Sequence, residues 1–309
     1  MIVSEIYTGS GLGNQIWHYV VTRLIAEKNG YKYGIQRPER WKGAQFMPID
    51  FGETVIGGDG PEGGPPNSLP EGITSYYPEL KVPHPATGDE VGAPDPKLFQ
   101  VPDNTKIEGT LQKMSYIQDH RDKIIEWLSY GDQYKVTDYA SDDICVIQFR
   151  GGDYLTGNSY LPPEYYQWAT EHFRSVNPNM RFVTVTDDPE NARKFIPFSE
   201  VVGSAITVEK DPLQGSIGWY RYPGGPVGID YSILNTAKNA IISASTFAFW
   251  PVWTNKEATV IAPKYWFDWR ISDGWWRPED AIVEDWYWLD NMGDLYTGSD
   301  CIKECKSFK

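Results

Sequence analysis

Cysteine and histidine are scarce in this sequence of 309 residues, and their scarcity excludes several kinds of protein. The three cysteines, Cys145, Cys301 and Cys305, are too few for a disulfide framework, and one C-x-x-x-C pair near the end is weak evidence for a metal site. Cys145 lies in an apolar run and is expected in the core. The four histidines share no ligand spacing, so no metal centre is predicted.

Basic residues and long apolar runs are also lacking. The 28 Lys and Arg residues are outnumbered by 42 Asp and Glu, and the formal net charge of −14 argues against a nucleic-acid partner. No window approaches the roughly 20 apolar residues of a membrane span, and no basic segment precedes an apolar stretch at the start. We therefore expect a cytoplasmic globular protein, in which any anion site is built locally from arginines and helix termini.

The first 35 residues follow the order strand, glycine turn, helix, strand. An apolar segment predicts a buried strand over 2–7, and the glycines of 9–14 predict a tight turn. Apolar residues at helical spacing predict a helix over 15–29 that ends at Gly30, with a further strand over 31–35. This succession is typical of the start of a doubly wound α/β sheet.

The next segment changes character. Residues 51–100 hold nine Gly and nine Pro with almost no periodicity, which indicates a long insertion that serves as a lid, a binding loop or a spacer. A helix is expected over 114–130, and a linker over 131–143.

The second half alternates between strand-like and helix-like segments. Strands are expected over 144–149, 181–186 and 240–243, with a final strand over 259–262. Helices are expected over 163–173, from 189 onward, over 229–238 and over 245–254. Repeated βα units imply a parallel sheet with right-handed crossovers. The chain is thus predicted to be α/β, with two Rossmann-like domains at 1–137 and 138–290 facing across a cleft, and a tail at 291–309.

Two glycine-containing turns carry the first chemical signals. In the turn after the first strand, Asn14 stands where a dinucleotide fingerprint has its third glycine, and no acidic residue ends the second strand. This turn suits an anion at a helix start, but an unliganded turn explains it equally well. In the second turn, Arg150 with Gly151 and Gly152 follows an apolar strand and should emerge at the carboxyl end of a parallel sheet, where a guanidinium can hold a diphosphate. Alone, this motif also fits a surface arginine in a βα loop.

Taken together and in order, several segments resemble the GDP-fucose-dependent α1,2-fucosyltransferases. They are Gly11-Leu12-Gly13-Asn14-Gln15, Glu108-Gly109 with Gln112 and Tyr116, Arg150-Gly151-Gly152-Asp153-Tyr154, Thr186-Asp187-Asp188, Ser245-Thr246-Phe247 with Trp250 and Trp253, and 260–267. The resemblance implies a GT-B fold, GDP-fucose as donor, a glycan acceptor, inversion at the anomeric carbon, and no obligatory metal or other cofactor.

The resemblance also implies site residues. Gln148 and Asp230 should lie near the guanine and ribose, although Asp230 also reads as an ordinary helix N-cap. Arg150, the amides of residues 11–14, and Ser245, Thr246 and Phe247 at a helix start should bind the nucleotide sugar, with Gln15 beside them. Asp153 is the candidate for the carboxylate that accepts the acceptor proton, or it orients Arg150.

Three departures from the family pattern leave alternatives open. Gln148 replaces a histidine, Gly151 replaces a second arginine, and Ala248-Phe249 replaces Ser-Trp. The chain could therefore use another GDP-sugar, or be an inactive carbohydrate-binding relative. A nicotinamide-dependent oxidoreductase, suggested by the glycine turn, is a weaker alternative. Trp275-Trp276 could stack on acceptor sugars, but packing of the tail onto the core is preferred.

Overall fold

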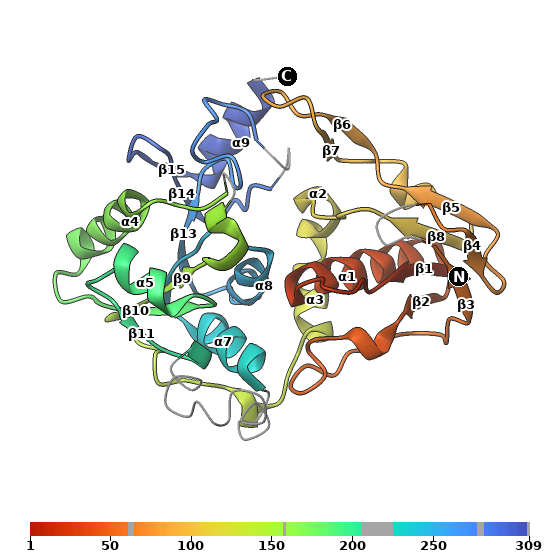
Figure 1. Ribbon diagram of the computed structural model, residues 1–309, viewed down its shortest axis with the longest axis horizontal. Helices are drawn as coiled ribbons and strands as arrows, with labels where there is room; N and C mark the ends of the chain where they lie inside the picture. The colour runs from red at the N-terminus through yellow and green to blue at the C-terminus, as the bar shows by residue number, and fades with distance from the viewer. Residues whose placement is uncertain (61–64, 157–158, 206–224, 277–280, 308–309) are drawn as a thin grey trace. The chain divides into compact units, whose positions relative to one another are not determined.

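The computed structural model describes residues 1–60, 65–156, 159–205, 225–276 and 281–307. The chain divides into two compact units. The first consists mainly of Met1–Lys42 and Ile49–Leu128, and the second of Gly43–Pro48, Ser129–Arg277 and Ile282–Lys309. Figure 1 labels the elements of both units. Within the described ranges, no helix combines the length and apolar character that crossing a membrane requires.

The first unit is built on a parallel sheet of four strands in the order β2-β1-β8-β5. Its strands are β1 (Ile2–Glu5), β2 (Tyr33–Gln36), β5 (Ser75–Pro78) and β8 (Thr105–Glu108). Helix α1 (Leu12–Asn29) connects β1 to β2 and packs against both. Gly30 ends α1 in the left-handed conformation, φ 68°, which glycine adopts without strain. The predicted opening of strand, turn, helix and strand is confirmed.

The Gly- and Pro-rich segment is more regular than its composition indicated. It contains an antiparallel pair, β3 (Gly57–Asp59) with β4 (Ser68–Pro70), the edge strand β5, a second antiparallel pair, β6 (Lys81–Pro83) with β7 (Glu90–Gly92), and the 3-10 turn η2 (Leu98–Gln100). The lack of periodicity in this segment thus did not mean a lack of strands. These strands are three or four residues long and almost entirely exposed or half-buried, so they bury no alternating apolar face that would mark them in the sequence.

The helix expected over 114–130 is interrupted. It consists of α2 (Met114–Ile117), the 3-10 turn η3 (Gln118–His120) and α3 (Arg121–Trp127). Asp and His are poor formers of helix interiors, which is consistent with a break at Asp119 and His120. Two more 3-10 turns, η1 (Pro38–Arg40) and η4 (Asp132–Tyr134), lie in loops.

The second unit holds a sheet of seven strands in the order β11-β10-β9-β12-β13-β14-β15. Its strands are β9 (Ile144–Phe149), β10 (Arg181–Thr186), β11 (Glu200–Val201), β12 (Asn239–Ile241), β13 (Thr259–Pro263), β14 (Tyr287–Leu289) and β15 (Leu295–Thr297). All neighbours are parallel except β14 and β15. The α/β class with two parallel sheets is confirmed, but β13 is not the final strand. The segment 291–309, expected to be a tail, supplies β15 and helix α9 (Gly298–Ser307).

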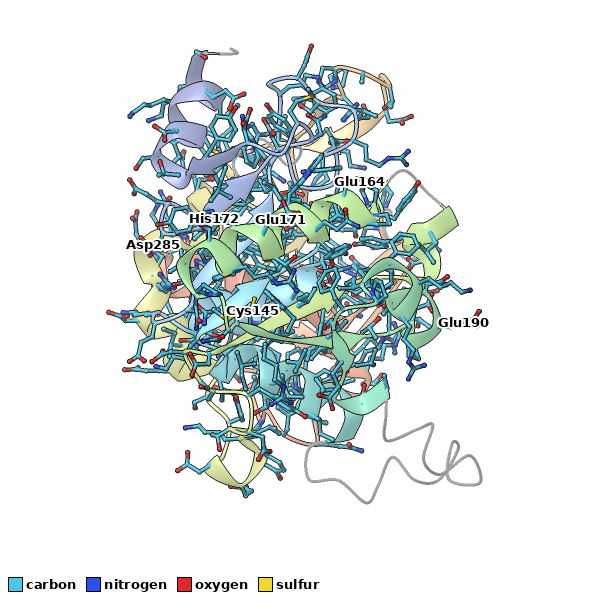
Figure 2. The ribbon with its side chains drawn as sticks, turned by 90° about the vertical axis from the view of Figure 1, so that its left-hand side faces the viewer. Cys145, Glu164, Glu171, His172, Glu190 and Asp285 are labelled. Atoms are coloured by element: carbon cyan, nitrogen blue, oxygen red, sulfur yellow. The ribbon has the colours of Figure 1, made fainter. Side chains whose placement is uncertain are left out.

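The helices of the second unit follow the predicted alternation. They are α4 (Pro163–Val176), α5 (Pro189–Phe195), α7 (Gly225–Thr236), α8 (Thr246–Thr254) and the 3-10 helix η5 (Gly152–Thr156). Figure 2 shows α4 with Glu164 and Glu171, both exposed, and Cys145 of β9 buried in the core. The core also takes up Trp276, whose ring contacts Trp288 at 5.1 Å between centroids, so packing rather than sugar stacking explains this tryptophan.

Candidate functional site

The second unit reverses its strand order beside β9. From β9 the chain runs outward through β10 and β11, and then returns to place β12 on the other side of β9. Such a switch point opens a crevice at the carboxyl ends of the two strands, where open α/β sheets bind ligands. The predicted segment 148–153 spans the end of β9 and the turn after it, and the segment 245–247 follows β12. The topology thus places both beside this switch point.

Arg150 is held by two carboxylates at this edge. Its Nη2 lies 2.7 Å from Asp153 Oδ1, and its Nη1 lies 2.5 Å from Asp187 Oδ2. The register pairs Phe149 with Thr186, so the residues that follow each strand are brought side by side. Arg150 remains 33% exposed, and a guanidinium has five N–H donors. Two ion pairs therefore fix the side chain and leave donors for an anion.

The glycines after Arg150 pack against a pair of aspartates. The Gly151 amide donates to Asp187 Oδ1 at 3.0 Å, and the Gly152 amide donates to Asp188 Oδ2 at 3.3 Å. A Cβ atom at residue 151 would lie 2.4 Å from the Cβ of Asp188, so a larger residue cannot fit without displacing that aspartate. Asp188 also accepts from the amide of Asn191 and caps α5, the helix predicted to begin at 189. Asp187 is not part of that cap, and its contact with Arg150 was missed from the sequence.

Two contacts join β9 and the loop that follows it to the loop after β12. Gln148, which is buried, accepts a hydrogen bond from the Ser243 hydroxyl. The Tyr154 hydroxyl donates to the Ala244 carbonyl at 3.2 Å, while the Tyr154 ring lies 5.1 Å from the Arg150 guanidinium. Tyr154 belongs to the motif that carries the resemblance, but no role in the site was assigned to it from the sequence. Its place two residues beyond the paired glycines was the available signal.

Helix α8 begins at the same edge. Ser245 is its buried N-cap residue, and its side chain makes no capping hydrogen bond within the described chain. Thr246 occupies the first position of the helix, and the half-buried Phe247 ring meets the Tyr231 ring at 6.4 Å between centroids. No acidic residue lies in the described first turn, so this helix start offers an N-terminus compatible with an anion.

Asp230 is not a helix N-cap, contrary to one of the two interpretations, because α7 begins five residues earlier, at Gly225. Its Oδ1 accepts from the Ser204 amide at 2.8 Å, and its Oδ2 accepts from the Ser204 hydroxyl. Burial raises the pKa of Asp230 to about 7; the hydrogen bonds from Ser204 lower it, and the charge of Asp187 raises it further. Asp187 thus lies within electrostatic reach of both Asp230 and Arg150.

The glycine turn of the first unit leads into α1 as predicted, and its residues differ in exposure and in hydrogen bonding. Gly11 is the exposed N-cap, whereas Leu12 and Gly13 are buried. The Asn14 Oδ1 accepts from Gln112 Nε2 at 3.2 Å. Gln15 is buried and holds the adjoining loop, since its Nε2 donates to the Ser10 and Arg40 carbonyls and its Oε1 accepts from the Lys42 amide.

A polar cluster that sequence reasoning missed lies at the carboxyl ends of β1, β2 and β8. Lys106, although buried, donates to Glu5 Oε2 at 2.8 Å and to Gln36 Oε1 at 3.2 Å. Arg37 and Arg40 also lie 3.8 and 3.7 Å from the other oxygen of Glu5. Polar residues at strand ends were the available signal. This edge is the second place in the chain where a parallel sheet presents fixed charges.

Among the residues that the structure describes, no group of three or more His, Cys, Asp and Glu side chains is arranged to hold a metal ion. The adjacent pair Asp187 and Asp188 is engaged instead by Arg150, by the amides of the glycine turn and by the cap of α5. The protein is thus an α/β protein with two parallel sheets. In the second unit Arg150 and the start of α8 follow β9 and β12, and in the first unit the start of α1 follows β1.

Comparison with known proteins gives one curated relative. The chain is 23% identical over 203 residues to the O-antigen biosynthesis glycosyltransferase WbnK of Escherichia coli. The match covers 56% of this chain and 62% of that protein, which is less than two thirds of its length. No protein-family model matches the chain.

Solved structures of NodZ α-1,6-fucosyltransferase are also similar. A co-crystal structure of NodZ with GDP covers 96% of both chains, at 11% identity and a TM-score of 0.46. The selenomethionine form of NodZ from Bradyrhizobium covers 96% of this chain and 97% of NodZ, at 13% identity and the same TM-score. The α1,2 class expected from the sequence stays a prediction.

Proposed function

We propose that this protein is an inverting glycosyltransferase of GT-B type that transfers L-fucose from GDP-fucose to a hydroxyl of a glycan, without a required metal. The observation that carries the proposal is Arg150, fixed by two carboxylates at the switch point of a parallel sheet beside two glycines. The ordered resemblance to α1,2-fucosyltransferases and the description of WbnK as a glycosyltransferase support it.

The reaction requires stabilisation of the leaving group. The acceptor oxygen forms a bond to the anomeric carbon, the bond from that carbon to the β-phosphate oxygen breaks, and GDP departs with the electron pair. Negative charge therefore grows on the diphosphate in the transition state, and fixed donors that meet this charge lower the barrier. Arg150 supplies a guanidinium, and the start of α8 at Ser245 and Thr246 supplies a helix N-terminus.

Asp153 has one of two roles in this scheme. As a base, it takes the proton that the acceptor hydroxyl loses late in the reaction. As a positioning residue, it holds Arg150 through the contact of 2.7 Å between Oδ1 and Nη2. Its carboxylate is 72% exposed, so it is accessible for either role. Comparing Asp153→Asn with Asp187→Asn separates the roles. If Asp153 is the base, kcat/KM falls at low pH in the wild type and in Asp187→Asn, and this fall is absent in Asp153→Asn. If Asp153 only positions Arg150, the two variants have the same pH profile.

The remaining predicted residues are assigned to the nucleoside, the nucleotide sugar and the acceptor. Gln148 and Asp230 are assigned to the guanine and ribose, with Phe247 nearby. The glycine turn of residues 11–15 is assigned to the nucleotide sugar, where Gly11 lets a ligand approach the helix start and Gln15 holds the adjoining loop. The N-terminal domain, residues 1–137, is assigned to the acceptor side, and part of its segment 51–100 is assigned to the contact with the acceptor.

Thermal unfolding with nucleotides tests the donor assignment. A ligand at about 100 times its Kd stabilises the native state by about 2.7 kcal/mol, so GDP should raise the melting temperature clearly more than UDP, CMP or NAD does. Equal shifts with all four would refute the GDP assignment, and a shift with NAD alone would support an oxidoreductase. Hydrolysis assays with GDP-fucose and other GDP-sugars then identify the donor. GDP binding without hydrolysis or transfer of any donor would identify an inactive relative.

A further inference from the structure

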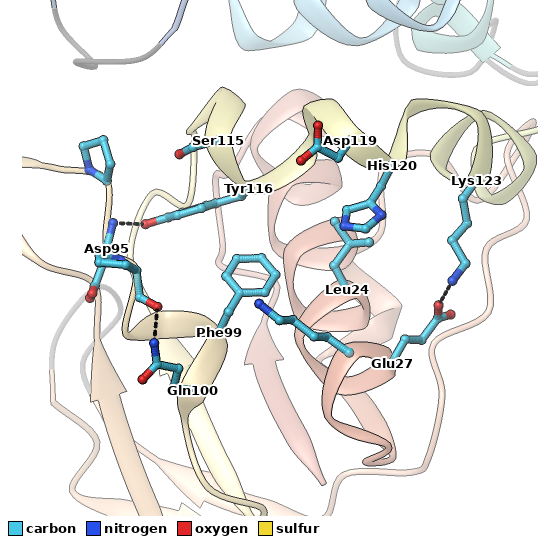
Figure 3. A pocket seen from close by; sticks show the side chains of 13 residues that line it. Leu24, Glu27, Asp95, Phe99, Gln100, Ser115, Tyr116, Asp119, His120 and Lys123 are labelled. Carbon is cyan, nitrogen blue, oxygen red and sulfur yellow. Dashed lines mark hydrogen bonds and ion pairs between the residues drawn. The ribbon is translucent and has the colours of Figure 1, made fainter. Parts of the chain in front are cut away.

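A groove of about 770 Å³ lies on the first unit, between the C-terminal half of α1, the segment around η2 and the segment α2–α3. Its volume lies within the range of roughly 300–1,000 Å³ that is typical of small-molecule sites. Figure 3 shows this groove and the side chains that line it. Its lining includes Leu24, Lys28, Phe99, Gln100, Tyr116 and Asp119.

The floor of the groove is aromatic. Phe99 is half-buried, and its ring meets the buried Tyr116 ring at 5.5 Å between centroids. Tyr116 is fixed by its hydroxyl oxygen, which accepts from the Asp95 amide at 2.9 Å. The ammonium group of Lys28 lies 5.1 Å from the centroid of the Phe99 ring. These contacts hold the Phe99 ring in one orientation at the centre of the groove (Figure 3).

The rim of the groove is polar and carries charges of both signs. Its exposed charged groups are Asp119, Lys28 and the paired Lys123 and Glu27, while the lining Asp95 is buried and accepts from the Tyr77 hydroxyl. The exposed Asp119 and Gln100 offer a carboxylate and an amide to a ligand on the floor. A rim without an excess of basic groups gives a nucleotide or a phosphorylated ligand no net electrostatic attraction.

One fixed aromatic ring inside a polar rim suits a sugar. The face of an aromatic ring carries partial negative charge and attracts the polarised C–H groups on the apolar face of a pyranose. Carboxylate and amide side chains accept and donate the hydrogen bonds that sugar hydroxyls need. We infer that this groove binds a sugar unit of a neutral glycan.

This site is separate from the glycine turn on the same unit. Leu24 lies twelve residues beyond Leu12 on α1, a distance of about 18 Å along the helix. The inference does not rest on the proposed transfer reaction, because saccharide binding is measurable with no donor sugar present. For a glycan-modifying enzyme, such a groove would hold a longer acceptor chain at a second point.

Saturation-transfer NMR on the full chain, with excess GDP present and no donor sugar, tests the inference. Lactose, cellobiose and maltotriose at millimolar concentration serve as neutral probes, and 3′-sialyllactose is the anionic match of lactose. Two variants alter the groove: Phe99→Ala removes the ring, and Ser115→Trp fills the space from an exposed position. Phe198→Ala and Ser175→Trp are the matched controls. Phe198 also has a cation 5.2 Å from its ring, and Ser175 is an exposed helical serine outside the groove.

At least one neutral saccharide should bind more tightly than sialyllactose. Each groove variant should weaken that binding about tenfold or more, while both controls bind as the wild type does. Melting curves identify any variant that is unfolded, and Ser115→Trp keeps the test valid if Phe99→Ala is unstable. Binding that survives Ser115→Trp would place the sugar elsewhere, and no binding of any neutral probe, or preference for sialyllactose, would overturn the inference.

Discussion

Replacement of Arg150 by lysine tests the proposed leaving-group clamp without changing the net charge. The guanidinium makes two ion pairs at once, 2.7 Å from Asp153 and 2.5 Å from Asp187. Asp153 is 72% exposed and Asp187 is 34% exposed, so these pairs are screened by water and should contribute less than about 1 kcal/mol to stability. An ammonium group cannot reproduce the fixed parallel donors that a diphosphate requires. Loss of one preorganised stabiliser of transition-state charge lowers the rate by about 100-fold or more, or roughly 3 kcal/mol.

The assay compares melting curves, GDP affinity and initial transfer rates of the wild type and Arg150→Lys. Arg181→Lys is a matched control. Arg181 is the first residue of β10, and it also pairs with a carboxylate at the surface, that of Glu200, at 3.2 Å. We expect both variants to melt near the wild type and only Arg150→Lys to lose transfer. If Arg150→Lys transferred at the wild-type rate, Arg150 would not clamp the diphosphate, and the proposed mechanism would have to be abandoned.

Three further predictions concern pH, packing and metal. Because burial raises the pKa of Asp230 to about 7, native Asp230 keeps a proton between about pH 4 and 7 that the unfolded chain has lost, so stability falls as the pH rises through this range and the full loss is present above pH 7. Asp230→Asn should therefore raise the melting temperature relative to wild type more at pH 8 than at pH 5; an equal difference at both would contradict the pKa. Gly151→Ala should destabilise the protein by about 1–2 kcal/mol in denaturant unfolding by displacing Asp188 from its cap, whereas Gly11→Ala, with open space at its Cβ, should not. Transfer should persist in excess EDTA, and an activity lost to EDTA and restored by manganese would place the reaction in a metal-dependent class.

Much of the second unit was predictable because its signals are local. The strand at 144–149 is a largely apolar run, the strand at 181–186 is rich in β-branched residues, and the structure has both with those limits. Asp188 before Pro189 combines a capping side chain with a residue suited to the first helical turn, and Asp188 caps α5. Short-range patterns of this kind are written into neighbouring residues.

The short strands of the first unit could not be read in the same way. Strands β3, β4, β6 and β7 are three residues long and largely exposed, so their partners rather than their own sequences define them. β14 and β15 likewise depend on pairing along the edge of the large sheet, beyond the strand that the sequence indicated as last. Composition rich in Gly and Pro indicated a loop where tertiary pairing formed sheet.

The candidate site shows the same division. The sequence by itself marked Arg150 and its glycines, because an arginine after an apolar strand and two small residues is a local pattern. It could not show that Asp187, 37 residues away, pairs with Arg150, since that contact follows from the register of β9 against β10. Nor could it show that the Gln15 side chain accepts a hydrogen bond from the Lys42 amide, or that Asp230 lies inside α7 with a raised pKa. Local sequence determined which elements form; packing between distant segments decided which side chains meet, because burial and hydrogen bonding depend on neighbours that the chain order does not reveal.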